Sequence, residues 1–177
     1  MTRTVLAGFS VVLLVVLRFQ AAPPDLSGVW RPDAAASKAE KVLKAQTDST
    51  VGKAPPPPPP AGPIHPTERI EQKDGTIQIT SLDEAGEVLN VLAFLPGGEE
   101  KLNPLAGGKV MHKSRARWVG AELHVEWSME REGQKFIWGS DVRSLQDSAT
   151  QRLERHVEDG KSWSHLVVVL RRVRSGP

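Results

Sequence analysis

The stretch from Lys109 to Arg143 constrains the fold most, because its strands can be set in register from the sequence alone. Glycine-containing two-residue turns at 120–121 and 132–133 predict two hairpins that share a middle strand. On one face, the predicted register places Trp118 opposite Leu123, Ala116 opposite Val125, Ser114 opposite Trp127, His112 and Phe136 opposite Met129, Trp138 opposite Trp127, Ser140 opposite Val125 and Val142 opposite Leu123. That face is apolar and aromatic.

The other face of the same three strands carries polar and charged side chains, and most of them face a side chain of complementary charge on the neighbouring strand. The predicted pairs are Arg115 with Glu126, Arg117 with His124, Glu130 with Lys135, His124 with Asp141, and Glu122 with Arg143. A slip of one residue would exchange the two faces, so agreement on both faces supports this register. The stretch therefore predicts a twisted antiparallel sheet with one apolar concave face.

Length and charge limit the classes of function. The chain has 177 residues, enough for one domain with a core plus a targeting segment. The formal net charge is +2, and both excess positive charges, Arg3 and Arg18, lie in the first 22 residues. The remainder is balanced, so nothing favours a nucleic-acid partner. Because the chain has no cysteine, a disulfide framework, a thiol nucleophile, Cys-ligated zinc and a lipid-modified cysteine are excluded.

Residues 1–22 are typical of a secretory signal peptide. A basic start at Arg3 precedes an apolar run from Val5 to Leu17. This run is shorter than the roughly 20 residues that a membrane-spanning helix needs. We expect export to the periplasm or the extracellular space, with cleavage after Ala22. The alternative is an uncleaved segment that tethers the protein to the membrane, and either case is compatible with a partner in the cell envelope.

The next segment, 23–46, is expected to hold a first strand and a helix. Asp25 to Trp30 has the pattern of a short strand, and the run from Ala34 to Gln46 follows an aspartate that is a suitable N-cap. Residues 47–66 are expected to be a linker, because the prolines Pro55–Pro60 cannot join a β-ladder and favour polyproline II. We interpret the linker as a stiff spacer; the alternative is a ligand for a module with an aromatic groove.

Residues 67–177 show a β pattern throughout. Asp74-Gly75 and Asp159-Gly160 are strong hairpin turns, and the run Leu166 to Leu170 is apolar at every position, which indicates a buried strand. Short strands roughly 8–12 residues apart, without long crossovers, favour a barrel. The prediction is an all-β protein, an up-and-down antiparallel barrel of about 8–10 strands. The predicted barrel combines residues 67–177 with the first strand at 25–31. One short helix near the N-terminus is expected between these two segments.

Residues at the two ends of this barrel resemble the lipocalin (calycin) signature. Gly28-Val29-Trp30 opens the first strand, and Arg171 or Arg172 ends the last one. In that family a Gly-x-Trp motif opens strand one, and a basic side chain of the final strand packs across the indole and closes the barrel floor. The phrase from Asp25 to Asp33 is also similar to the opening of exported, uncharacterised bacterial lipocalin-like proteins. The resemblance implies small apolar or amphipathic ligands in the barrel mouth, and it does not imply catalysis.

Six residues are predicted to line a ligand site on the inward face. They are His112, Ser114, Trp127, Phe136, Trp138 and Ser140. An apolar pocket needs a few polar groups to orient a bound molecule, and the histidine and serines would supply them. The alternative is ordinary core packing, because aromatic cross-strand pairs stabilise sheets by about 0.5–1.5 kcal/mol, and a small barrel can either fill with side chains or hold a ligand.

The sequence contains no string typical of a catalytic, metal or cofactor site, so no such residue is assigned. Three functional hypotheses are compatible with it. The first is an exported protein that binds a small hydrophobic or amphipathic molecule in the barrel. The second is a structural or interaction module of the cell envelope with a filled barrel. The third is a hydrolase or isomerase on the same barrel, for which no catalytic set is visible.

Overall fold

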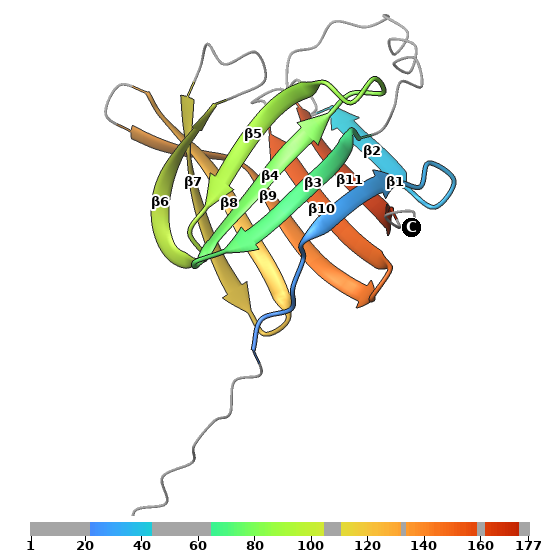
Figure 1. Cartoon of the computed structure of the whole chain (residues 1–177). Coiled ribbons are helices and arrows are strands. Elements are labelled where there is room, and N and C mark those ends of the chain that lie inside the picture. Colours follow the sequence, from blue (N-terminus) through green and yellow to red (C-terminus); the bar gives the residue numbers. More distant parts are fainter. Residues whose placement is uncertain (1–21, 44–64, 105–110, 132–133, 159–161, 174–177) are drawn as a thin grey trace, which may run out of the picture.

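The computed structural model describes residues 22–43, 65–104, 111–131, 134–158 and 162–173, and these residues form a nearly closed antiparallel β-barrel without a helix (Figure 1). The strands are β1 (Gly28–Pro32), β2 (Lys38–Leu43), β3 (Thr67–Lys73), β4 (Thr76–Leu82), β5 (Val88–Phe94), β6 (Gly97–Pro104), β7 (Met111–Val119), β8 (Glu122–Arg131), β9 (Gln134–Asp147), β10 (Thr150–Glu158) and β11 (Ser162–Arg172). The predicted all-β class is confirmed, with eleven strands in the described part of the chain.

All pairings in the sheet are antiparallel, as predicted, and consecutive strands pair from β3 to β5 and from β6 to β11. The order along the sheet is β5-β4-β3-β1-β11-β10-β9-β8-β7-β6, and β2 pairs with β11 beyond β1. Strand β1 lies between β3 and β11, so it joins the β3–β4 hairpin to the β10–β11 hairpin. Figure 1 shows the resulting barrel, with β1 in blue between the green and red strands.

The helix predicted over residues 34–46 was wrong for the part that the structure describes. The carbonyl of Asp33 accepts a hydrogen bond from the N–H of Ser37 at 3.0 Å, which closes a turn. Lys38–Leu43 then continues along β11 as strand β2. The helical pattern was misleading because pairing with a neighbouring strand outweighs differences in helix propensity of a few tenths of a kcal/mol per residue.

Two predicted segments fall largely on residues that the structure does not describe. The signal peptide covers 1–21 of those residues, and the proline-rich linker covers 47–64. Both remain predictions. Within the described ranges, there is no helix that is long and apolar enough to cross a membrane.

The two ends of the sheet, β5 and β6, meet through side chains, and we call this junction the seam. The side chain of Asn103 accepts a hydrogen bond from the N–H of Ala93 at 2.7 Å and donates one to its carbonyl at 2.9 Å. Asn90 donates a further bond to the carbonyl of Pro104 at 3.3 Å. The Asn103 amide therefore takes the place of a backbone pair between the two strands.

The first predicted hairpin is confirmed from the pair of Lys113 with Ser128 to its turn, and the predicted pair of His112 with Met129 lies outside this register. In β7 and β8, Trp118 lies opposite Leu123, Ala116 opposite Val125 and Ser114 opposite Trp127. The second hairpin begins as predicted, with Met129 opposite Phe136, but its register shifts at a bulge between Trp127 and Ser128. From there on, the pairs are Trp127 with Gly139, Val125 with Asp141 and Leu123 with Arg143.

The bulge corrects the predicted faces of β9. One extra residue exchanges the two faces of a strand, because side chains alternate with a period of two. Asp141 and Arg143 therefore lie inside the barrel, 3% and 1% exposed, and the predicted outward pairs of these residues with His124 and Glu122 were wrong. Ser140, predicted to point inward, lies on the outer face instead.

Gly139 explains why the extra residue is accommodated here. A Cβ at this position would lie 2.7 Å from Cε3 of Trp127 and 2.9 Å from the carbonyl oxygen of His156. Only a residue without a side chain leaves room for the Trp127 ring against this backbone. A glycine inside a strand often marks such a bulge or close approach.

Candidate functional site

The floor of the barrel is built as the lipocalin resemblance implied. Trp30 is fully buried, and its indole N–H donates a hydrogen bond to the carbonyl of Leu26 at 2.8 Å. The guanidinium carbon of Arg172 lies 4.5 Å from the centre of the Trp30 ring, a cation–π contact. Gly28 has a φ of +137°, a conformation that residues with a side chain rarely adopt, and its Cβ position would be in ordinary contact with Nη1 of Arg172 at 3.5 Å. Arg171, the other candidate, is exposed and pairs with Asp33 at 3.2 Å.

Three of the predicted ligand residues meet inside the barrel, and we call them the ring cluster: His112, Trp127 and Trp138. The two indole rings lie 5.1 Å apart between centroids, although the bulge means that they are not cross-strand partners. The imidazole stands edge-on to both, at 5.5 Å from Trp138 and 6.3 Å from Trp127. The cluster therefore joins β7, β8 and β9 through aromatic contacts.

The ring cluster contains four polar atoms that are buried without a hydrogen-bond partner in the described structure. They are Nδ1 and Nε2 of His112 and the indole nitrogens Nε1 of Trp127 and Trp138. Buried polar atoms are almost always paired, and leaving one unpaired costs about 1–3 kcal/mol. Burial also lowers the pKa of His112, so its imidazole is neutral at pH 7 and offers one donor and one acceptor.

The other predicted site residues have different surroundings. Ser114 is buried on the same wall, but its hydroxyl already accepts a hydrogen bond from Asn103 at 2.5 Å. Ser140 lies outside, as described above. The strand position of Phe136 is as predicted, but its side chain lies outside the described residues. The structure therefore groups Ser114 with the ring cluster and separates Ser140 from it.

A buried charge network, which the sequence did not reveal, lies elsewhere in the interior. Arg143 on β9 donates two hydrogen bonds to the carboxylate of Glu68 on β3, at 2.6 and 2.9 Å. The ring of His65 contacts the same carboxylate at 2.8 Å, and the amide oxygen of Gln151 accepts from Arg143 at 3.2 Å. Burial opposes ionisation of Glu68, but Arg143 and His65 outweigh it and hold the pKa of Glu68 well below its usual range.

A second ion pair joins the half-buried Arg155 to the buried Asp141, which also lies 3.8 Å from Arg143 and so connects this network to the ring cluster. Arg155 on β10 donates to both carboxylate oxygens of Asp141 at 2.9 Å, and its guanidinium lies 4.8 Å from the centre of the Trp127 ring. Burial alone would lower the pKa of Arg155, but the charge of Asp141 more than compensates and raises it. These contacts place two arginines, Arg143 and Arg155, against two carboxylates, Glu68 and Asp141.

The barrel end near the β3–β4 and β5–β6 turns contains a partly open cavity of about 610 Å³. Inward side chains line it, among them Gln72, Ile77 and Trp118. Trp118 and His112 are at opposite ends of the inward face of β7, so this cavity is distinct from the ring cluster. Its volume is within the range of small-molecule sites, which is about 300–1,000 Å³.

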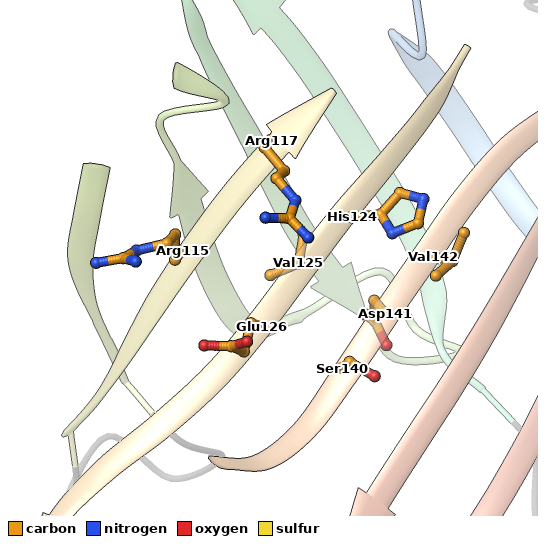
Figure 2. Close-up of a pocket in the computed structure, with 8 residues that line it drawn as sticks. All are labelled: Arg115, Arg117, His124, Val125, Glu126, Ser140, Asp141 and Val142. Carbon is orange, nitrogen blue, oxygen red and sulfur yellow. The ribbon is translucent and has the colours of Figure 1, made fainter. Parts of the chain in front are cut away.

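A smaller pocket of about 150 Å³ lies on the outer face of β7, β8 and β9 (Figure 2). Arg115 and Arg117 project from β7, His124 and Glu126 from β8, and Ser140 from β9. On their strands these residues stand at outward positions next to buried, inward ones, which are Ala116 on β7, Val125 on β8 and Asp141 on β9. Ser140 reaches this pocket because the bulge turned it away from the interior.

Neither a protein-family model nor a curated protein matches this chain. Solved structures similar to it include the zebrafish ileal bile acid-binding protein in complex with cholic acid, which is 16% identical with a TM-score of 0.47 and covers 60% of this chain and 72% of that one. Another is a mutant of the fluorescent protein UnaG, 22% identical with a TM-score of 0.46, covering 66% and 78%. The cholic acid is the ligand of the zebrafish protein in that structure.

Within the described residues, no group of three or more His, Asp and Glu side chains is placed to hold a metal ion. The ring cluster can instead offer hydrogen bonds from the ring nitrogens of His112, Trp127 and Trp138 on the inner face of the barrel. Sequence reasoning did not place Asp141, Arg143 and Glu68 inside the barrel. For the first two, Gly139 within the strand pattern was a signal that could have indicated the bulge.

Proposed function

We propose that this protein binds a small, planar, hydrophobic or amphipathic molecule inside the barrel, at the ring cluster. The observation that supports the proposal is the set of four unpaired ring nitrogens on His112, Trp127 and Trp138. Leaving a buried polar atom unpaired costs about 1–3 kcal/mol, and these four atoms have no hydrogen-bond partner among the described residues. A bound molecule that pairs with them would recover part of this free energy.

The chemistry of the ring cluster indicates what the molecule must offer. Indole N–H groups only donate, so at least two of the four atoms need acceptors such as carbonyl or carboxylate oxygens. The rings themselves favour a flat, apolar partner. A cation is disfavoured, because Arg155 already lies over the Trp127 ring and the carboxylate of Asp141 is engaged by that arginine.

The proposal is tested with three naphthalene probes that differ in one substituent: 1-naphthamide, 1-naphthoate and 1-naphthylmethylammonium. Isothermal titration calorimetry of the full chain should give saturable binding of the first two and much weaker binding of the ammonium. Replacing Trp138 with phenylalanine keeps a ring but removes one donor. We expect about a tenfold loss of affinity, equivalent to roughly 1.4 kcal/mol for one hydrogen bond.

Two other tryptophans serve as matched controls. Trp163 stacks on His156 with centroids 5.7 Å apart, at outward positions of β10 and β11, so Trp163→Phe should leave probe affinity unchanged. Trp118→Phe changes the wall of the 610 Å³ cavity instead. A loss of affinity in Trp118→Phe alone would place the probe in that cavity and contradict binding at the ring cluster, as would the absence of binding by any acceptor probe.

We also propose that the protein is exported. A structural role in the cell envelope is the alternative to ligand binding. The support is the basic start and apolar run of residues 1–22. Expression of the full chain in a bacterial host, followed by fractionation and N-terminal sequencing, should recover a chain that begins at Pro23. Recovery of the intact chain from the cytoplasm would contradict export.

A further inference from the structure

Arg117 is an exposed cation for which the described residues provide neither an ion pair nor a hydrogen bond. Its cross-strand neighbours are Gly97 on β6 and His124 on β8, and neither carries a carboxylate. Arg115, two residues earlier on the same face, does have a partner, because Glu100 lies 3.4 Å away. The unpaired state of Arg117 therefore follows from the residues that the register places beside it.

The guanidinium of Arg117 belongs to the 150 Å³ pocket of the outer face, and it lies over the strands rather than extending into solvent (Figure 2). His124 from β8 and Ser140 from β9 border the same hollow. The Ser140 hydroxyl has no hydrogen-bond partner among the described residues. Nε2 of His124 contacts Glu122 at 3.1 Å, which leaves the other ring nitrogen available.

We propose that this pocket is a second binding site, for a phosphate-type oxyanion held by Arg117, His124 and Ser140. A guanidinium presents its N–H groups in a planar fork that matches phosphate oxygens, and such charge-assisted bonds are stronger than neutral ones. The Ser140 hydroxyl can complete the donor set, and Nδ1 of His124, an acceptor because Nε2–H is directed at Glu122, can accept the P–O–H of hydrogen phosphate. A volume of 150 Å³ is below that of most small-molecule sites, but it suffices for a single tetrahedral group.

The acidic groups near the pocket limit the affinity without abolishing the site. Asp141 is turned inward, and its charge is compensated by Arg155. Glu126 lies opposite Arg115 and Ser140 and has an interaction of its own. Since its negative charge opposes an anion, we expect a dissociation constant on the order of 1 mM for inorganic phosphate.

The test is a titration of the ¹⁵N-labelled full chain with inorganic phosphate at constant ionic strength, followed by NMR of the backbone amides and arginine Nε–H groups. Saturable shifts should concentrate on β7, β8 and β9 around Arg117. A parallel titration with glycerol 3-phosphate separates two sources of the group. Binding of both ligands indicates a phosphate carried by a larger molecule, whereas binding of inorganic phosphate alone indicates the free ion.

Arg117→Gln should weaken phosphate binding at least tenfold. The matched control is Arg69→Gln, since Arg69 is also exposed on the outer face, between Val29 and Thr80, but borders neither pocket described above. This control should bind phosphate as the unmodified protein does. Shifts that grow linearly without saturation, or an unchanged affinity in Arg117→Gln, would overturn the proposal and show screening of surface charge only.

Discussion

Replacing Arg143 with methionine removes the cation that holds Glu68 inside the barrel. The two side chains are 1% and 2% exposed and come from β9 and β3, which three other strands separate in the sheet order. Methionine fills a similar volume without a charge, so the change isolates the ion pair from the packing around it. Of its hydrogen-bond partners in the described part of the chain, the carboxylate of Glu68 then retains His65 alone.

The expected loss of stability can be estimated in two ways. Two charge-assisted hydrogen bonds contribute about 1.5–3 kcal/mol each, which gives roughly 3–6 kcal/mol. Removing one partner of a buried ion pair costs about 3–5 kcal/mol in other proteins. Against a total of about 5–15 kcal/mol for a domain, Arg143→Met should bring the protein close to unfolding.

Urea unfolding at pH 7, followed by circular dichroism, measures this loss. A second variant, Glu68→Leu with Arg143→Met, removes both charges, and it should recover much of the stability because no uncompensated charge remains. A cost below about 1 kcal/mol for Arg143→Met, or a double variant less stable than the single one, would refute the reasoning.

The same pair predicts a pH dependence. The pKa of Glu68 is depressed in the folded protein, so its contribution is complete above the ordinary glutamate value of about 4.3. It is lost as the pH falls through the lower, folded-state value. In the unmodified protein, the free energy of unfolding should therefore decrease as the pH falls through this range. In Arg143→Met this part of the decrease should be absent.

Three further changes test the architecture by urea unfolding. Gly139→Ala should cost about 1–3 kcal/mol, because the new methyl group overlaps the Trp127 ring. Asn103→Ala should cost about 1–3 kcal/mol and should accelerate hydrogen exchange at Ala93, since the seam loses both side-chain bonds. Arg172→Met should cost about 2 kcal/mol through the lost cation–π contact with Trp30.

The first hairpin of the central meander was predictable from the sequence because its two strands pair without interruption. Turn residues set the register, and the alternation of apolar and charged side chains confirmed it on both faces. In the second hairpin the predicted register holds only near the turn and is wrong beyond Ser128. A single glycine, Gly139, shifted the pairing by one position and turned Asp141 and Arg143 inward.

The contacts that depend on barrel closure could not be predicted. Glu68 and Arg143 are 75 residues apart in sequence, and only the closed sheet brings their strands face to face. The helix predicted over residues 34–46 is absent from the described part of that range for a related reason, because residues 38–43 pair with the edge of β11. The floor contact of Trp30 with Arg172 was predictable only through the family resemblance.

The central claim is that the indole nitrogens of Trp127 and Trp138, which have no hydrogen-bond partner among the described residues, pair with a bound ligand. The most direct measurement is the ¹H–¹⁵N spectrum of the five tryptophan indoles, assigned with single Trp→Phe variants, before and after addition of 1-naphthamide. The account predicts large shifts for Trp127 and Trp138 and none for Trp30, whose N–H is already bonded to Leu26. Unchanged signals from Trp127 and Trp138 at a saturating probe concentration would contradict it.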